Sequence, residues 1–300
     1  MTGMVTEIER FALSDGPGIR TTVFFKGCDL RCAWCHNPET IRPGRDVHYY
    51  ARNCIGCLQC AAVCPHGAHG GEPGLHRFDA TLCTRCGRCA AVCYPGAMAL
   101  SGTAMTVEQV MAQVRQDLPY YRSSGGGVTL SGGEVLCQPD FALALIEACH
   151  ALDISVCLET NLHRPFDDVA AVLTAADLIL CDLKLIDAEA HRRLTGADNA
   201  QILQNIRRLD TLRRPYAVRT PVVPGATDSD ANILGIAAFL ATCPHLLYYE
   251  LLNFNPLGGP KYASLSLPDP YAGAMPLPAA RMRALAALAQ GAGVQTRADG

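Results

Sequence analysis

The sequence predicts an α/β protein in which buried parallel strands alternate with helices and a cysteine-rich segment interrupts the series near its start. The first observation is that strand-length apolar runs alternate with helix-length amphipathic segments from residue 106 onward. The second is that eight of the 16 cysteines fall into two matched runs between residues 54 and 93. The third is the length of 300 residues, which allows one large α/β domain or two smaller ones with a sizeable core.

Composition and charge narrow the class of protein. Charged residues make up 18% of the chain and its formal net charge is -3, so no basic field invites nucleic acid. The N-terminal residues include Glu7, Glu9 and Arg10 in place of the apolar core of a signal peptide. No apolar run approaches the ~20 residues that span a bilayer. We therefore expect a reduced, cytoplasmic protein with no membrane or nucleic-acid partner, whose cysteines hold metal rather than form disulfides.

The predicted strands and helices follow one another in a regular order. A Gly-Pro-Gly turn at residues 16–18 precedes the first strand, residues 21–26. After the cysteine-rich segment, Thr106 is a suitable N-cap for a helix over residues 106–121. Further strands are predicted at residues 127–131, 155–159, 178–182, 216–223 and 246–254, which makes six. The other helices are predicted at residues 139–152, 167–176, 188–212 (one helix or two), 229–241 and 278–292.

The loop after the first strand carries three cysteines, Cys28, Cys32 and Cys35, with CxxxCxxC spacing. A 4Fe-4S cluster normally takes four thiolate ligands, so three cysteines leave one iron without a protein ligand. An open metal position separates a catalytic site from a closed structural one, and it indicates chemistry at the free iron. The alternative is that these three thiols bind zinc or no metal.

Two cysteine runs of C-x2-C-x2-C-x3-C spacing follow this loop. Bacterial ferredoxins share this spacing, and in them the fourth cysteine of each run ligates the other cluster. The rule predicts two 4Fe-4S clusters, held by Cys54, Cys57, Cys60 and Cys93 and by Cys83, Cys86, Cys89 and Cys64. Two zinc sites are the alternative, although zinc modules usually pair C-x2-C knuckles. Tyr94 stands where the first run has Pro65, and we expect this difference to alter only the turn.

Polar side chains follow the predicted strands at their carboxyl ends, where the functional loops of a barrel converge. The ends of strands two to four read Ser131-Gly132-Gly133-Glu134, Glu159-Thr160-Asn161 and Asp182-Leu183-Lys184. Strand five carries Arg219, and strand six ends in Asn253-Phe254-Asn255-Pro256. Glycines allow a close backbone approach to a ligand, and Glu134 can accept hydrogen bonds from a cationic amine. Lys184 and Arg219 suit a carboxylate or a ribose, or else form solvated ion pairs.

Two further segments make the resemblance to a known family specific. Residues 15–21 read Asp-Gly-Pro-Gly-Ile-Arg-Thr, and the cluster loop continues as Trp34-Cys35-His36-Asn37-Pro38-Glu39. From Asp15 to Leu265 the chain resembles the glycyl-radical-enzyme activating enzymes, a branch of the radical S-adenosylmethionine (radical SAM) superfamily. The resemblance implies a partial (β/α)6 TIM-type barrel with an inserted ferredoxin-like dicluster domain. The implied domains are residues 1–46 and 99–300 for the barrel and residues 47–98 for the insert.

The resemblance also implies cofactors and site residues. S-adenosylmethionine chelates the open iron, and with the two insert clusters the chain holds three 4Fe-4S clusters. The residues implied to contact S-adenosylmethionine are Trp34, Cys35, His36, Gly132, Gly133, Glu134, Glu159, Thr160, Asp182, Leu183, Lys184, Arg219 and Asn255. The Gly-Gly-Glu motif receives the amine, and Trp34 lies near the adenine or, alternatively, packs in the core. Asp15, Gly16, Pro17 and Gly18 contact the partner's peptide, and no catalytic residue is implied beyond the cluster and cofactor.

Two residues depart from the pattern of the pyruvate formate-lyase activases. Glu159 stands where those enzymes have Asp, and Asn255 stands where they have His. Glu is longer than Asp, so we expect the contact at this position to be shifted. Asn255 forms hydrogen bonds but does not titrate near neutral pH. Asn at this position resembles the insert-bearing activases.

These features favour one function over two others. The first hypothesis is an activating enzyme that reductively cleaves S-adenosylmethionine to a 5'-deoxyadenosyl radical, which abstracts hydrogen from a backbone glycine of a glycyl radical enzyme. The second is a radical SAM enzyme acting on a small molecule or a peptide, although no cysteine after Cys243 is present to hold an accessory cluster. The third is an electron carrier, which gives no reason for the open loop. We expect a monomer that receives electrons from flavodoxin or ferredoxin, and the sequence does not specify which glycyl radical enzyme it activates.

The remaining cysteines and histidines have no ligand spacing. We interpret five cysteines as small, buried hydrophobic side chains: Cys137, Cys149, Cys157, Cys181 and Cys243. The histidines of the insert are interpreted as solvated or as neighbours of the cluster ligands: His48, His66, His69 and His76.

Overall fold

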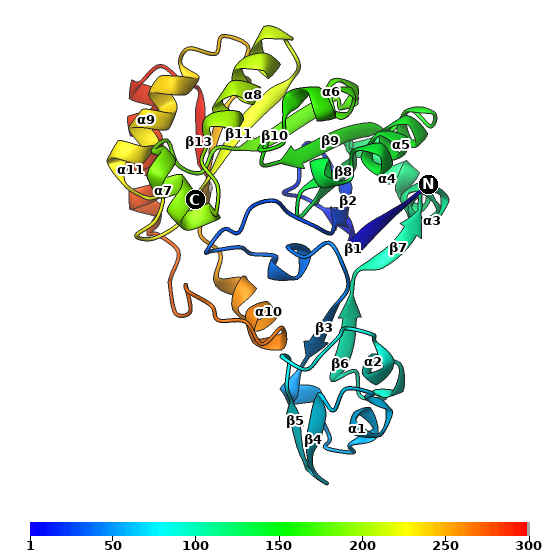
Figure 1. Cartoon of the computed structure of the whole chain (residues 1–300). Helices are drawn as coiled ribbons and strands as arrows, with labels where there is room; N and C mark the ends of the chain where they lie inside the picture. Colours follow the sequence, from blue (N-terminus) through cyan, green and yellow to red (C-terminus); the bar gives the residue numbers. More distant parts are fainter. Residues whose placement is uncertain (299–300) are drawn as a thin grey trace.

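A computed structural model, which describes residues 1–298, places one large sheet at the centre of the chain (Figure 1). The sheet has nine strands in the order β13-β12-β11-β10-β9-β8-β2-β1-β7. Seven neighbouring strands run parallel: β2 (Arg20–Phe25), β8 (Gly127–Gly132), β9 (Ser155–Thr160), β10 (Leu178–Asp182), β11 (Tyr216–Val222), β12 (Tyr249–Asn253) and β13 (Thr296–Ala298). The carboxyl ends of these strands therefore meet at one edge of the sheet, where the loops that follow them can form a site.

The predicted α/β class with six parallel strands is confirmed, and three further strands extend the sheet. β1 (Thr2–Ala12) pairs antiparallel with β2 and with β7 (Thr103–Thr106), while β13 is parallel to β12. The prediction missed β1 because its alternation is broken by charged residues and by two irregularities in its register with β2. β7 and β13 are four and three residues long, which is too short for a periodic pattern.

Helices connect the parallel strands, as predicted. The segment expected as one helix over residues 106–121 consists of α3 (Val107–Val114), a 3-10 turn and α4 (Leu118–Ser124), and Thr106 caps α3 in a capping box with Gln109. The segment 188–212 is two helices, α7 (Ala188–Thr195) and α8 (Ala200–Thr211), because Gly196 adopts a φ of +87° and ends the first. The others are α5 (Pro139–His150), α6 (Phe166–Ala175), α9 (Asp230–Leu240), α10 (Gly259–Ser264) and α11 (Ala279–Gly291). Among residues 1–298, no helix is long and apolar enough to cross a membrane.

The helices cover the outside of the sheet and bury a continuous apolar core with it (Figure 1). Leu130 and Leu158 on the strands and Ile146 on α5 are fully buried there. Burial of a side chain of this size contributes roughly 1.5–3 kcal/mol to folding. The predicted burial of cysteines outside the ligand runs is confirmed for Cys149, Cys157, Cys181 and Cys243, whereas Cys137 is partly exposed.

The cysteine-rich segment forms a lobe that projects from the end of the sheet (Figure 1). An antiparallel pair, β3 (Asp46–Tyr49) and β6 (Met98–Ser101), closes this lobe where it joins the rest of the chain. The lobe contains the hairpin of β4 (His69–Glu72) and β5 (Leu75–Phe78) and two five-residue helices, α1 (Gln59–Val63) and α2 (Arg88–Val92). The β3–β6 ladder extends slightly beyond residues 47–98, and the division into domains stays a prediction.

Buried polar contacts join this lobe to the end of β2. Lys26 is fully buried, and its Nζ lies 2.8 Å from Asp46 Oδ2 and also donates to the backbone carbonyl of Glu39. Asp46 Oδ1 in turn lies 3.1 Å from Nε of Arg85, which belongs to the second cysteine run. Because Lys26 precedes Cys28 by only two positions, these contacts tie the insert to the three-cysteine loop.

Candidate active site

The three-cysteine loop lies at the carboxyl end of β2, held by backbone hydrogen bonds to the end of α7. Arg31 N donates to Thr195 O at 2.6 Å and Ala33 N donates to Leu194 O at 2.9 Å. The cysteines of this loop, Cys28, Cys32 and Cys35, line one cavity of about 350 Å³ at the strand ends. The structure therefore brings the three predicted ligands to the wall of a single space.

Burial keeps these three thiols protonated in the absence of metal. It raises the pKa of Cys35 to about 12, with the Cys32 thiolate as the next cause, and it also raises the pKa of Cys28 and of Cys32. Thiolates are the ligands that iron–sulfur clusters require, so cluster binding here displaces protons. The donor set would fit a 4Fe-4S cluster held by three thiolates, since no fourth cysteine among residues 1–298 lines the cavity.

Most of the predicted cofactor contacts line this same cavity. They are Trp34, Cys35, His36, Gly132, Gly133, Glu159, Thr160, Asp182, Lys184, Arg219 and Asn255. Glu134 and Leu183 do not line it, and both side chains are buried. Leu183 points into the core because successive side chains of an extended segment alternate between faces, so its neighbours Asp182 and Lys184 reach the cavity instead.

Glu134 ties two strand ends together from a fully buried position. Its carboxylate accepts hydrogen bonds from Thr160 Oγ1 at 2.7 Å, from Asn161 N at 2.7 Å and from Leu136 N at 2.9 Å. Burial raises the pKa of Glu134 to about 7, although the hydrogen bonds from Asn161, Leu136 and Thr160 favour the charged form. The carboxylate thus accepts three hydrogen bonds within the chain and does not line the cavity, and its predicted contact with the amine stays a prediction.

The two glycines before Glu134 allow the end of β8 to approach the cluster loop. A Cβ on Gly132, whose φ is +116°, would lie 2.3 Å from Phe25 N, and a Cβ on Gly133 would lie 2.4 Å from Gly27 O. Glu134 N donates to Gly27 O at 2.8 Å. Glycine is required here for backbone packing against the loop, and the same glycines leave the cavity wall open beside them.

Arg219 is held between two carboxylates. Its Nη1 lies 2.5 Å from Glu159 Oε1 and its Nε lies 2.8 Å from Glu250 Oε2. Ser131 Oγ donates to the other oxygen of Glu159 at 2.5 Å. Burial lowers the pKa of Arg219, but Glu159 and Glu250 outweigh it and the net shift is upward. For Glu159, burial raises the pKa of the carboxyl group, and this effect exceeds the lowering caused by the charge of Arg219.

Lys184 reaches the cavity from the end of β10 as a buried ammonium. Its Nζ lies 2.5 Å from Asp182 Oδ2. Burial lowers its pKa, but the negative charge of Asp182 outweighs burial, with an additional upward effect from Cys32 when that thiol is ionised, so Lys184 stays charged. A buried cation beside the three-cysteine loop suits an anionic group bound in the cavity.

Trp34 packs in an apolar cluster, as the core alternative predicted, and it also borders the cavity. It packs with Leu185 and Val223 in a small apolar cluster, and its ring lies edge-on to Tyr271 at 6.3 Å. It also lines the cavity together with Asn255. Contact between Trp34 and an adenine stays a prediction.

Sequence reasoning did not assign a role to the residues that surround Cys28. Asn161 Nδ2 lies 3.7 Å from Cys28 Sγ and 3.0 Å from Asp29 Oδ1. His163 Nδ1 lies 3.2 Å from Asp29 Oδ2. For Asn161 the sequence contained one indication of a role in the site, its position directly after Glu159 and Thr160. Nothing in the sequence indicates that His163 contacts the three-cysteine loop.

The segment predicted to contact a partner peptide borders a second cavity of about 360 Å³. Asp15 lines it, and Ser131, Glu159 and His36 line both this cavity and the first. Asp15 Oδ2 accepts a hydrogen bond from Thr22 Oγ1 at 2.6 Å. Gly16, Pro17 and Gly18 do not line this cavity, and Gly18 packs against the backbone of Gly126, where no larger residue fits.

In the insert, the eight cysteines separate into two groups around two small cavities. One cavity is lined by Cys54, Cys57, Cys60 and Cys93. The other is lined by Cys64, Cys83, Cys86 and Cys89. This is the exchange of the fourth cysteine that the ferredoxin spacing predicts, although ligation itself stays a prediction.

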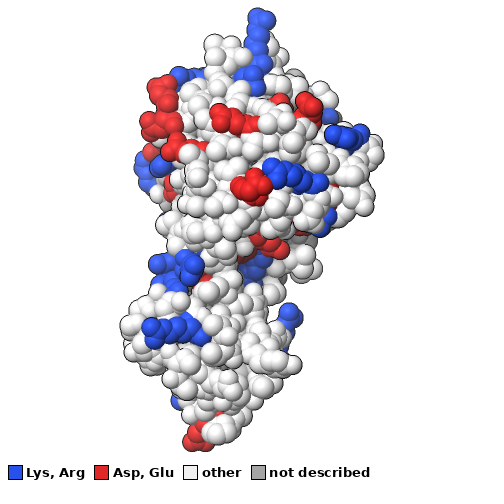
Figure 2. All heavy atoms as spheres, turned by 90° about the vertical axis from the view of Figure 1, so that its right-hand side faces the viewer, with Lys and Arg blue, Asp and Glu red and all other residues white. Residues whose placement is uncertain are grey.

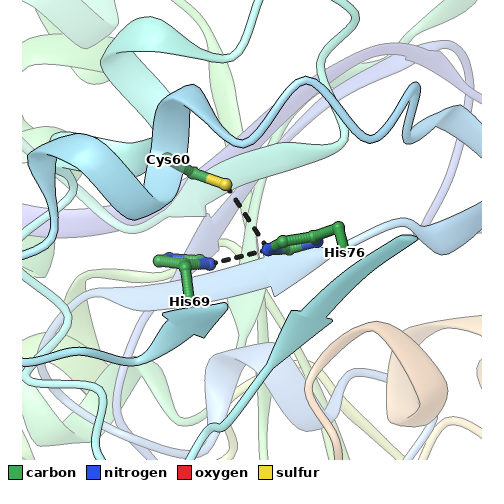
Figure 3. Close-up of side chains that lie close together, drawn as sticks. All are labelled: Cys60, His69 and His76. Atoms are coloured by element: carbon green, nitrogen blue, oxygen red, sulfur yellow. Dashed lines mark hydrogen bonds between the residues drawn. The ribbon is translucent and has the colours of Figure 1, made fainter. Parts of the chain in front are cut away.

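Two histidines lie beside the first of these cysteine groups (Figure 3). His76 Nε2 lies 3.4 Å from Cys60 Sγ and 3.0 Å from His69 Nδ1. One ligand atom from each of these three residues lies within 4.8 Å of the others, as a metal site requires. Burial lowers the pKa of both histidines, and the charge of a protonated His76 lowers that of His69 further. Because Cys60 belongs to a complete four-cysteine set, we interpret the histidines as its hydrogen-bonding neighbours.

Sequence profiles of two families match parts of the chain. The Radical SAM superfamily matches residues 82–235, and the 4Fe-4S binding domain matches residues 47–68. The second match contains the first cysteine run. The three-cysteine loop lies outside both matches, since the insert separates it from the rest of the barrel.

Similar proteins of known function decide the family. The (2S)-3-sulfopropanediol dehydratase activating enzyme of Klebsiella oxytoca is 40% identical over 276 residues, 89% of this chain and 86% of that protein. The indoleacetate decarboxylase activating enzyme of Tractidigestivibacter scatoligenes is 38% identical over 306 residues, 98% of this chain and 96% of that protein. The benzylsuccinate synthase activating enzyme of Thauera aromatica is 40% identical and covers 89% of this chain and 83% of its own length. The chain belongs to the glycyl-radical enzyme activating enzymes.

Solved structures of more distant proteins share the fold of this activating enzyme. A radical SAM methyltransferase from Sphaerobacter thermophilus matches 98% of this chain and 76% of its own with a TM-score of 0.52 at 14% identity. Streptococcus suis SuiB bound to precursor peptide SuiA matches 91% of this chain and 46% of its own with a TM-score of 0.55 at 13% identity. The predicted radical SAM barrel with a ferredoxin-like insert is confirmed by these matches and by the two family profiles.

As a member of this family, the activating enzyme uses 4Fe-4S clusters and S-adenosylmethionine and acts on a glycyl radical enzyme. The chemistry of this family is reductive cleavage of S-adenosylmethionine to methionine and a 5'-deoxyadenosyl radical, which abstracts hydrogen from a backbone glycine of the partner. In this chain Cys28, Cys32 and Cys35 would hold the cluster that supplies the electron. The chain supplies the three thiols, the buried cation Lys184 and the cavity at the strand ends that they border. The alternatives of a small-molecule or peptide enzyme and of an electron carrier are therefore set aside.

Proposed function

We propose that this activating enzyme holds three 4Fe-4S clusters and that only the one at Cys28, Cys32 and Cys35 binds S-adenosylmethionine. The observation that carries the proposal is the division of 11 cysteines among three cavities in sets of three, four and four. Only the three-cysteine set borders the large cavity at the strand ends, where a cofactor has room.

Within that cavity we assign the amine of S-adenosylmethionine to the backbone beside Gly132 and Gly133, since Glu134 does not line the cavity and its carboxylate accepts three hydrogen bonds within the chain. Lys184 is the cation placed to meet the carboxylate, because Arg219 is already paired with two carboxylates. Glu159 holds Arg219 and Ser131 in place. Its side chain is longer than that of Asp, and the extra length serves to reach these two residues. The other assignments follow from the lining of the cavity: Trp34, His36, Thr160, Asp182 and Asn255.

The setting of the reaction is also a proposal. The partner's glycine segment enters past Asp15 and the turn Gly16-Pro17-Gly18. This entry lies beside the second cavity, which shares Ser131 and Glu159 with the cavity at the strand ends. The insert, residues 47–98, is a ferredoxin-like module between barrel segments 1–46 and 99–300. The enzyme works as a monomer in the cytoplasm and takes electrons from flavodoxin or ferredoxin.

Anaerobic reconstitution is expected to give about twelve irons per chain, because three 4Fe-4S clusters each hold four. Iron and acid-labile sulfide assays on the same sample measure the number directly. A stable count near four, or zinc in place of iron, would contradict the ferredoxin assignment of the insert. Exposure to air is expected to bleach the protein.

The insert clusters are expected to relay electrons, which a comparison of two reductants tests. Cys57→Ser and Cys86→Ser each remove one ligand from one insert set, and both thiols are exposed. A relay predicts that cleavage of S-adenosylmethionine driven by reduced flavodoxin is largely lost while the dithionite-driven rate is largely kept. The measurement is 5'-deoxyadenosine release with each reductant.

The alternative is that the insert only supports a surface that docks the partner. Equal loss with both reductants, together with weaker binding of the glycyl radical enzyme, would favour that alternative. Because small metal-bound modules depend on the metal to fold, circular dichroism must show that the variants stay folded. Cys137→Ser is the matched control, since this cysteine is partly exposed and outside all three ligand sets.

A further inference from the structure

The two cysteine cavities of the insert lie at different distances from the barrel. Val47 lines the cavity of the Cys64 set, and Met98, which pairs with Tyr49 across the β3–β6 ladder, lines the cavity of the Cys54 set. The ladder starts at Asp46, where the ion pair with Lys26 joins it to the barrel. Because β3 runs away from the barrel from Asp46 to Tyr49, the cavity of the Cys54 set is the distal one (Figure 1).

The surface over this distal cavity is apolar and strongly exposed. Ile55, which lines the cavity between Cys54 and Cys57, is 65% exposed, and Cys57 itself is exposed. Tyr94 is 98% exposed and joins Cys93 to Pro95, both of which line the same cavity. An isoleucine and a tyrosine held in solvent at this level contribute nothing to the core, whereas exposed aromatic and apolar side chains are typical centres of protein contacts. We name Arg52, Ile55, Cys57 and Tyr94 the distal patch.

The arginine, aspartate and glutamate side chains of the insert carry a net charge opposite to that of the rest of the chain, before the negative charge of thiolate-ligated clusters is counted. Residues 47–98 contain four arginines and two acidic residues, a net +2, while the remainder of the sequence carries -5. Arg52, Arg77 and Arg88 are exposed, and none of them forms an ion pair with any of residues 1–298. On the face shown in Figure 2, basic side chains lie along the lower lobe, while acidic ones lie mainly on the barrel and at the lower tip. Arg52, two positions before Cys54 and three before Ile55, is thus an unpaired cation beside the apolar centre, and such a cation attracts and orients an acidic protein.

We propose that the distal patch is the docking site for a small acidic one-electron carrier protein. The proposal rests on the proposed relay function of the insert. The carrier is oxidised by one electron, which enters at the group held by the Cys54 set, and no bond is made or broken. A glycyl radical enzyme is the less suitable occupant, because its glycine must reach the cavity at the strand ends and the patch lies at the far end of the lobe.

Binding of a flavodoxin of net negative charge tests the proposal without depending on turnover. The loaded enzyme is immobilised anaerobically, and the Kd for oxidised flavodoxin is measured at low and at high salt. We expect the double variant Ile55→Ser, Tyr94→Ser to weaken binding by about tenfold, which is typical for loss of central contacts. Arg52→Glu is expected to weaken it by a similar factor at low salt and much less at high salt, because salt screens the attraction.

Matched controls on the barrel keep the test specific. Leu247→Ser removes a side chain that is 44% exposed, and Arg193→Glu reverses an exposed charge on α7. Both are expected to leave the Kd within about twofold, as for contacts outside a hot spot. Iron content and circular dichroism show that every variant remains loaded and folded.

Two outcomes would overturn the docking site: patch variants that bind flavodoxin like the wild type, or a wild-type enzyme that does not bind it. Loss of affinity for the glycyl radical enzyme, with flavodoxin binding unchanged, would assign the patch to that partner instead. Failure of the relay is distinguishable from these results. In that case flavodoxin binding depends on the patch, yet Cys86→Ser, which lies outside the patch, retains full flavodoxin-driven cleavage of S-adenosylmethionine.

Discussion

Replacement of Cys28, Cys32 and Cys35 by alanine is expected to abolish reductive cleavage of S-adenosylmethionine. These three thiols are the cysteines that border the cavity at the strand ends, and without them no iron is held where the cofactor binds. The two insert clusters are expected to survive, since their cysteines line separate cavities. The measurements are 5'-deoxyadenosine release with dithionite and the iron content, which should fall from about twelve to about eight per chain.

The control for this triple variant is Cys137→Ala, which removes a thiol outside every ligand set. It is expected to keep both its iron and its activity. Continued release of 5'-deoxyadenosine by the triple variant would place the reaction at one of the insert clusters. Loss of all iron would show that the loop cluster is required for the insert to form.

The strands and the site edge were predictable because local patterns encode them. Alternation of apolar strands with amphipathic helices gave the six central strands, and cysteine spacing gave the two ligand groups of the insert. β1 could not be found in the same way, because its charged residues and irregular register hide its periodicity. β1 pairs with β2 and with β7, and these contacts are visible only in the tertiary structure.

The pairing of charged side chains in the site could not be predicted, because it depends on strand register. Arg219 lies opposite Glu250 on β12 and opposite Asp182 on β10. The sequence shows that each of these residues belongs to a predicted strand, but it does not show which ones face each other. Only the register shows that Arg219 forms ion pairs with Glu159 and Glu250. Lys184 is then the cation that remains for a ligand.

The junction between barrel and insert is a second feature that only the structure reveals. Lys26 is followed by the cluster loop, and Asp46 opens the insert, 20 positions later. Their side chains are 0% and 7% exposed, so the pair is removed from water. An ion pair in such a place contributes to orientation, and removal of one member leaves a buried charge without its partner.

The second large effect is therefore expected from Asp46→Ala, which leaves the Lys26 ammonium buried with only a backbone carbonyl among its described partners. Breaking one side of a buried pair costs roughly 3–5 kcal/mol. The measurement is the apparent free energy of unfolding in anaerobic denaturant titrations, with hydrogen exchange of β3 and β6 as a local reading of the junction.

Two comparison variants separate this effect from a general loss of charge. Glu108→Gln breaks the exposed pair with Arg115 and is expected to leave the free energy of unfolding nearly unchanged, because water and salt screen an exposed pair. The double replacement Lys26→Met, Asp46→Leu removes both charges and is expected to recover most of the stability, because apolar side chains can replace a buried pair. If Asp46→Ala were as mild as Glu108→Gln, water would have to reach Lys26, and the insert would not be fixed to the cluster loop by this contact.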